Sequence, residues 1–289
     1  MNRQLIPAAV ALISALLWGL WWIPVRAMEH AGFAGSWAGV AMCLAALPLL
    51  AASLYFKRAK DQLSLKSGAG AVMIGAAMIL YSASLTDTTV LRAILLFYLA
   101  PAWSMVLEAF FVGRKLRWIN AGALCLALIG VLFVFRGDVS FGGWRFGDTV
   151  ALMSGAVWAA GCLLVFTGPA VSYRKLAVTS CVSAIAIGTL VALFFEVSLS
   201  SLVFLENAVP LALLLGCLYV TPLLLATLWS AVRLPPTTLS FILTAEILSG
   251  VVSAAILLSD PFGWPEIIGS VLVICAALSE VIPARKPQS

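Results

Sequence analysis

Residues 5–25 read LIPAAVALISALLWGLWWIPV and contain no charged side chain. An apolar run of this length fits a helix that crosses the hydrocarbon core of a bilayer, which needs roughly 20 residues. A secretory signal peptide has a shorter apolar core and is not followed by a series of further apolar runs. We therefore interpret this stretch as the first membrane-spanning helix, retained in the mature protein.

Further apolar stretches follow along the chain, and the sequence predicts an all-α integral membrane protein of ten transmembrane helices. The links between them are short and rich in Gly, Pro and charged residues, as at Arg114, Lys115 and Arg117. None of the links is long enough to hold a soluble domain. The ten predicted spans are residues 5–25, 36–56, 67–85, 93–111, 118–135, 149–167, 176–195, 208–232, 237–258 and 264–282.

The composition excludes an ordinary soluble protein, because 63% of the 289 residues are hydrophobic and only 10% are charged, against about 25% charged residues in soluble domains. A net charge of +5 would suggest nucleic acid in a soluble protein, but here the basic residues occupy alternate links. Loops rich in Lys and Arg stay in the cytoplasm, so both termini are expected there, which requires an even number of spans. The opposite side receives only Arg26, Arg92, Arg136 and Arg145.

The chain shows weak internal similarity at half its length, which predicts two related halves of five helices each, residues 1–138 and 139–289. Because five is odd, the second half must enter the membrane inverted, and inverted repeats are a recurrent plan of secondary transporters. The alternative is a duplication that built only a stable bundle or a channel. The residues Val10, Ala11, Leu12, Ser14 and Trp18 recur in register as Val150, Ala151, Leu152, Ser154 and Trp158.

Two motifs give the chain a family resemblance. The stretch 98–101 (YLAP), followed by 112–116 (VGRKL), Trp118 and the glycines from Gly122 to Gly130, resembles the fourth and fifth helices of the EamA family of the drug/metabolite transporter superfamily. The second half matches through Gly147, Asp148, Trp158, the stretch 246–258, Trp264 and Gly269.

The branch that this chain is most similar to is that of the bacterial aromatic amino acid exporters, through the Tyr-Leu-Ala-Pro pattern and the Arg-Gly-Asp sequence at 136–138. The resemblance implies a ten-helix fold and export of amino acids. Two departures bear on substrate chemistry. Family members often carry Gly-Glu where this chain has Gly113 and Arg114, and a proline where it has Ile247.

Glu246 is the carboxylate expected nearest the middle of the bilayer, where a charged side chain costs about 2.5–3.5 kcal/mol on insertion scales. The functional interpretation is that it faces a central cavity and binds a substrate amine or carries a proton. The alternative is a protonated carboxyl group that forms a hydrogen bond to a neighbouring helix.

Prolines interrupt two predicted spans. Pro101 lies in the middle of the fourth span, at the position that pairs with Glu246 under the repeat, and Pro222 lies in the eighth. A proline removes a helix hydrogen bond, so both are hinge candidates, although many membrane helices simply tolerate proline. Pro24 and Pro48 are nearer to helix ends and are interpreted as packing features.

Aromatic residues at comparable depth could line a cavity for an amphipathic solute, while Trp118, Trp144 and Trp264 are interpreted as interfacial anchors. Close helix contacts are expected at Gly68, Gly70 and Gly75 and from Gly122 to Gly130. The candidate substrate-binding residues, with Glu246, are Trp18, Tyr81, Tyr98, Trp103, Trp158 and Tyr219.

The remaining patterns argue against other classes. The six cysteines have no metal-binding or disulfide spacing, and no nucleotide-binding loop, catalytic pair or bound cofactor is indicated. The spans offer few polar side chains for a channel pore. The sequence thus favours a bacterial inner-membrane exporter of amino acids or similar metabolites, with a small-molecule substrate and the lipid bilayer as partners, no nucleic acid, and a monomer favoured. Alternatives are a multidrug or other metabolite exporter, or a channel.

Overall fold

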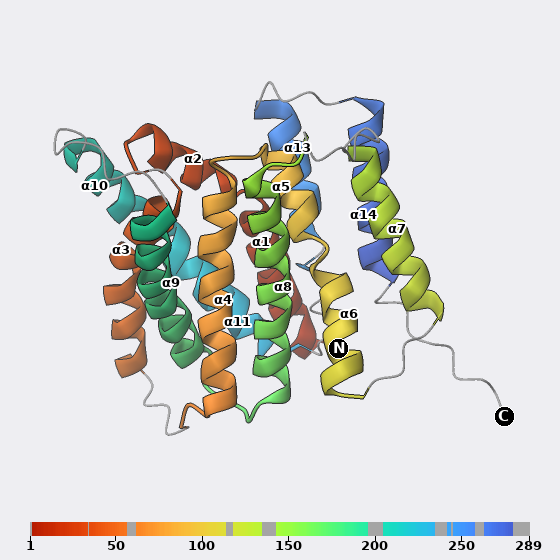
Figure 1. The fold of residues 1–289 in the computed structure, drawn as a ribbon. Helices are drawn as coiled ribbons and strands as arrows, with labels where there is room; N and C mark the ends of the chain where they lie inside the picture. Colours follow the sequence, from red (N-terminus) through yellow and green to blue (C-terminus); the bar gives the residue numbers. More distant parts are fainter. Residues whose placement is uncertain are drawn as a thin grey trace.

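The computed structural model describes residues 2–33, 35–56, 62–113, 118–134, 143–195, 205–234, 242–243, 245–257 and 263–279. Throughout these residues the regular structure is helical (Figure 1). The helices are α1 (Asn2–Gly19), α2 (Trp22–His30), α3 (Ser36–Phe56), α4 (Leu65–Ser84), α5 (Val90–Phe97), α6 (Ala100–Phe111), α7 (Trp118–Val134), α8 (Phe146–Thr167), α9 (Tyr173–Phe195), α10 (Leu205–Leu215), the π-helix η2 (Gly216–Val220), α11 (Thr221–Ala231), α13 (Ala245–Leu257) and α14 (Trp264–Ser279).

Seven segments within the described residues are long and apolar enough to cross a membrane. Three of them combine elements, namely α1 with α2, α5 with α6, and α10 with η2 and α11. The predicted fifth, ninth and tenth spans correspond to α7, α13 and α14, which are shorter. Part of each of these three predicted spans lies outside the described residues. The all-helical membrane fold is therefore supported, and the number ten stays a prediction.

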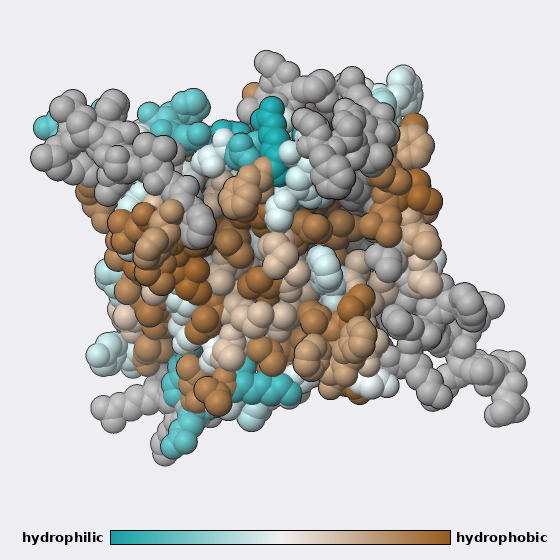
Figure 2. Space-filling model, viewed as in Figure 1, coloured by the Kyte–Doolittle hydropathy of each residue, from teal (hydrophilic) through white to brown (hydrophobic). Residues whose placement is uncertain are grey.

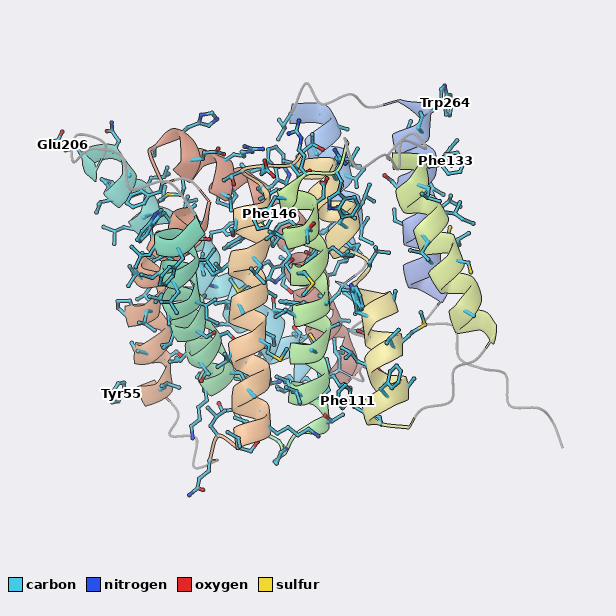
Figure 3. The ribbon with its side chains drawn as sticks, viewed as in Figure 1. Tyr55, Phe111, Phe133, Phe146, Glu206 and Trp264 are labelled. Atoms are coloured by element: carbon cyan, nitrogen blue, oxygen red, sulfur yellow. The ribbon has the colours of Figure 1, made fainter. Side chains whose placement is uncertain are left out.

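The surface of the molecule matches a bilayer. Figure 2 shows hydrophobic side chains over the middle of the visible face and hydrophilic ones gathered towards its two ends. Large apolar side chains such as Leu193, Phe194 and Leu218 are exposed, and a soluble monomer avoids such exposure over a wide area. The ends of α3 and α6, marked by Tyr55 and Phe111, lie at one end of the bundle in Figure 3, opposite Phe146 and Trp264.

Small residues let helices that are distant in sequence pack closely. Helix α4 lies against α8, and at their contact a Cβ atom on Gly70 would come within 2.7 Å of the Gly161 carbonyl oxygen. Helix α4 also packs on α9, where Gly75 faces Ser180 and Ser183. Such approaches are the usual means of helix association in lipid. The expected contacts at Gly70 and Gly75 are thus present.

The same expectation is wrong for two other glycines. A Cβ atom on Gly122 would meet no described atom within 4 Å, and the residue is exposed. A Cβ atom on Gly68 would meet only Leu63, a near neighbour in sequence. Helix α7 nevertheless pairs with α14 (Figure 1). Spacing alone therefore did not identify which glycines face a partner helix.

Candidate functional site

Three of the spanning segments are interrupted, and each interruption is followed within a few residues by a proline. The first segment breaks at Leu20 and Trp21, ahead of Pro24, and the fourth at Tyr98 and Leu99, ahead of Pro101. The eighth changes to a π-helix at Gly216–Val220, ahead of Pro222. A proline cannot donate to the carbonyl four residues earlier, so the helix loses a bond at that point. Pro24, expected to be a packing feature, thus follows a break.

The break between α5 and α6 leaves one backbone carbonyl without its usual helical donor. Because Pro101 has no N–H, the carbonyl oxygen of Phe97 lacks the helical donor four residues later. The Leu99 N–H instead donates to Leu96 oxygen at 3.3 Å, a tighter turn. Gly155 of α8 packs directly against the Phe97 carbonyl, leaving no room for a side chain. The two helices therefore meet backbone to backbone at the break.

The break between α1 and α2 is held by indole hydrogen bonds to three different helices. The Nε1–H groups donate to hydroxyl oxygens, from Trp18 to Thr227 of α11 at 2.9 Å, from Trp21 to Ser82 of α4 at 3.1 Å, and from Trp22 to Ser253 of α13 at 3.0 Å. Satisfying these donors inside an apolar bundle removes the cost of burying them. The interrupted segment is thereby fixed at the centre of the fold.

A small cavity lies where these segments meet. Its volume is about 20 Å³, enough for about one water molecule. This space is far smaller than the roughly 300 Å³ of a typical ligand pocket. Its walls come from α1, α4, α5, α8 and α13, and from Trp21 between α1 and α2. The lining residues are Trp18, Trp21, Ala77, Met78, Tyr81, Phe97, Trp158 and Glu246.

The rings around this cavity form a continuous series, the aromatic arc, in which each ring contacts the next. The centroids of Trp18 and Trp158 are 6.1 Å apart, and those of Tyr81 and Phe97 are 5.2 Å apart. Ring planes tilted by 36–68° along the arc suit edge-to-face attraction. In order, the arc is Tyr219, Trp21, Trp18, Trp158, Phe97 and Tyr81, with Tyr98 also in contact with Phe97.

Glu246 supplies the carboxylate of the cavity from the first turn of α13. Its backbone oxygen is in close contact with Gly19, so α1 and α13 touch at this level. The hydroxyl groups of Tyr81, Tyr98 and Tyr219 all lie within electrostatic range of the carboxylate. The Tyr98 hydroxyl lies beside it and is buried, yet no described atom completes a hydrogen bond with that hydroxyl.

The predicted site residues fall into two groups. Trp18, Tyr81, Trp158 and Glu246 line one cavity, and Tyr98 and Tyr219 border it through their ring contacts. Trp103 does not line it; this residue of α6 packs on the hydrophobic core, and its buried indole N–H has no partner among the described residues.

Sequence reasoning missed four lining residues, namely Trp21, Phe97, Ala77 and Met78. A signal existed for two of them. Trp21 follows Trp18 by three residues and so falls on the same helical face, and Phe97 directly precedes the Tyr98 motif. Among the described residues, no group of three His, Cys, Asp or Glu side chains could hold a metal ion.

A second polar cluster joins α5 and α8 near the end of the bundle where Phe146 lies (Figure 3). The Arg92 guanidinium contacts the fully buried Asp148 carboxylate at 2.9 Å. Asp148 also accepts hydrogen bonds from the Thr88 hydroxyl and the Arg145 backbone N–H. Three partners compensate for removing this carboxylate from water. The cluster therefore ties the fourth segment to the start of α8.

Comparison with known proteins supports a membrane transporter domain. Residues 5–136 match the model of the EamA-like transporter family. A crystal structure of another protein shares the fold with a TM-score of 0.61, covering 98% of this chain and 99% of that chain at 16% sequence identity. No curated protein matches the chain. The expected family is supported over residues 5–136, and no named relative bears on the aromatic amino acid exporter branch.

Proposed function

We propose that this chain is a secondary transporter of the EamA-like type that exports small amphipathic metabolites, amino acids among them, by alternating access. The observation that carries the proposal is the small central cavity. Two interrupted segments of the first half meet helices α8 and α13 of the second half there, and the Glu246 carboxylate is part of the wall. Discontinuous helices at the midplane are a common way for transporters to build a substrate site.

The packing of the helices supports two equivalent halves, residues 1–138 and 139–289. If the sixth to tenth spans correspond in order to the first to fifth, α3 is equivalent to α9 and α7 is equivalent to α14; both are packed pairs. Under the same exchange the contact of α5 and α6 with α8 becomes that of α13 with α1, which is also present. This equivalence favours ten spans in an inverted repeat, as transporters use it.

The small volume of the cavity favours alternating access over a channel. A conducting channel needs a continuous polar path, whereas the space at the centre holds about one water and is bordered by rings. A transporter in an occluded state is expected to look like this. A multidrug or other metabolite exporter of the same fold remains the alternative within transporters.

The orientation follows from the charge asymmetry of the links. We place both termini in the cytoplasm and the protein in the bacterial inner membrane, because all but four of the 17 Lys and Arg residues fall in links on the side of the termini. The end of the bundle that carries Tyr55 and Phe111 is then cytoplasmic (Figure 3). We favour a monomer, which transports without a cofactor.

The test is uptake of radiolabelled amino acids into liposomes that contain the purified protein, with and without a pH gradient. Saturable uptake is expected, and Glu246→Gln is expected to abolish it because the cavity loses its charge. Glu206→Gln is the matched control, since Glu206 is exposed at the start of α10. Stimulation by the gradient would show proton coupling. Absence of uptake over a broad panel of amino acids and other metabolites would contradict the proposal.

A further inference from the structure

The described side chains that line the cavity include a carboxylate and no cationic group. Five of its lining side chains are aromatic, two are apolar, and one is the Glu246 carboxylate. No Lys, Arg or His of the described chain lines it. Aromatic faces carry negative charge in their π-systems and attract cations, most strongly when water is excluded. Both kinds of polar feature on the wall therefore favour a positive group.

A substrate carboxylate would find no cation among the described lining residues of this cavity, only the neutral donors of Trp158 and Tyr81. The indole N–H groups of Trp18 and Trp21 already donate hydrogen bonds to the hydroxyl oxygens of Thr227 and Ser82. The buried Tyr98 hydroxyl lies beside the cavity carboxylate, so a second carboxylate drawn to this hydroxyl would meet a like charge. A buried carboxylate without a paired cation is strongly disfavoured.

Two arginines of the described residues are engaged at other sites. Arg92 contacts Asp148 and also donates to the Gly143 carbonyl oxygen at 2.8 Å. Arg26 pairs with Glu29 at 2.8 Å. Neither arginine is a lining residue of the cavity. Recruiting either one to pair with a substrate carboxylate would break these contacts.

We propose that the cavity selects organic cations, ammonium compounds with an apolar or aromatic body, over zwitterionic amino acids that carry the same side chain. The ammonium group would lie against the Glu246 carboxylate, with the body among the rings of Trp18, Trp158 and Tyr81. This inference rests on the proposed transport function and narrows its substrate class. It also requires the cavity to widen, because about 20 Å³ cannot hold such a ligand.

The experiment compares ligands that share one body. Calorimetric binding to the purified, detergent-solubilised protein is measured for L-phenylalanine, 2-phenylethylamine, its N-trimethyl derivative and the uncharged 2-phenylethanol. We expect both cations to bind at least about tenfold more tightly than phenylalanine, and the alcohol to bind weakly. The trimethyl derivative is charged at every pH, so its binding reports charge rather than proton transfer.

Variants separate the roles of charge and rings. Glu246→Gln is expected to weaken binding of the trimethyl cation by about tenfold or more while leaving the alcohol unchanged, and Glu246→Asp to restore part of the loss. Trp158→Phe keeps a ring and should retain more affinity than Trp158→Leu. Glu206→Gln is the control that changes a carboxylate outside the cavity. Monodispersity on size exclusion shows that each variant is folded.

The outcomes distinguish this inference from the proposed function. If phenylalanine binds as tightly as the amine and is transported, the cation preference is wrong and the transport function stands. If Glu246→Gln, folded, binds the trimethyl cation as well as the parent protein does, the cation preference is also wrong. If the cations bind as expected but neither they nor amino acids are transported in liposomes, the transport function fails and the binding preference stands.

Discussion

Gly155 determines how closely α8 can approach the break in the fourth segment. A Cβ atom there would clash with the Phe97 carbonyl, which is backbone and cannot turn away as a flexible side chain could. We expect Gly155→Ala to lower the stability of the protein by about 1–3 kcal/mol, as overpacking does in other cores. The melting temperature in detergent measures this effect.

Gly122→Ala is the matched control for that measurement, because a Cβ atom there would meet nothing within 4 Å. It should be neutral or stabilising by up to about 1 kcal/mol, since alanine favours a helix over glycine. Equal melting temperatures for the two variants would show that the contact of Gly155 with Phe97 is not close.

The buried ion pair at the start of α8 gives a second prediction at the residue scale. Asp148→Ala leaves Arg92 and Thr88 without their carboxylate, and breaking a buried pair from one side costs about 3–5 kcal/mol. The control is Glu29→Ala, which removes a half-exposed pair with Arg26 and should cost no more than about 1 kcal/mol. Denaturant unfolding measures the free energy of unfolding of both variants. Similar decreases in the two variants would contradict a larger contribution from the buried pair.

Sequence reasoning selected four of the eight residues that line the cavity, and it used different signals to do so. Trp18 and Trp158 were selected by the internal repeat, and the structure places their rings in contact. Glu246 was selected because placing a charged side chain near the middle of a bilayer costs free energy. Trp103 was selected by depth alone, which does not report the face of a helix, and it lies outside the cavity. Ala77 and Met78 carry no chemical signal, so only packing could find them.

At the scale of helices, the break between α5 and α6 makes a prediction about rate. Pro101→Ala would restore the N–H that the Phe97 carbonyl lacks and allow one continuous helix. We expect transport to slow several-fold while the affinity for substrate changes little, because a stiffer segment opposes the change of state. Initial uptake rates and binding affinities, measured on the same preparation, separate the two quantities.

Pro48 provides the control for the hinge. It lies inside α3, which continues through it without a break, and it is exposed. Pro48→Ala should leave the transport rate unchanged. If Pro101→Ala also leaves it unchanged, the segment does not act as a hinge. The contrast between these prolines also explains why the breaks were hard to predict, since proline permits an interruption and packing decides whether one forms.

At the scale of the whole molecule, the charge pattern predicts which end faces the cytoplasm. In a variant without native cysteines, Glu206→Cys and Trp264→Cys should react with an impermeant thiol reagent added to intact cells. Tyr55→Cys and Phe111→Cys, at the opposite end in Figure 3, should react only after lysis. Labelling of Tyr55→Cys in intact cells would reverse the assigned orientation.

The sequence could predict the helical membrane fold because hydropathy reports directly on contact with lipid. It could not predict which helices pair, such as α4 with α8, because those contacts depend on small residues facing one another across long separations. Nor could it show that Trp18, Trp21 and Trp22 each bind a hydroxyl on a different helix. These features arise only once the chain is packed.

The small volume of the cavity has a consequence for the energy supply of the cell. A bacterial membrane maintains a voltage, and each mole of elementary charge that crosses 100 mV dissipates about 2.3 kcal of free energy. A water-filled passage through the bundle would drain that store continuously. With space for about one water in the cavity beside its rings, the aromatic arc is expected to act as electrical insulation in the proposed membrane.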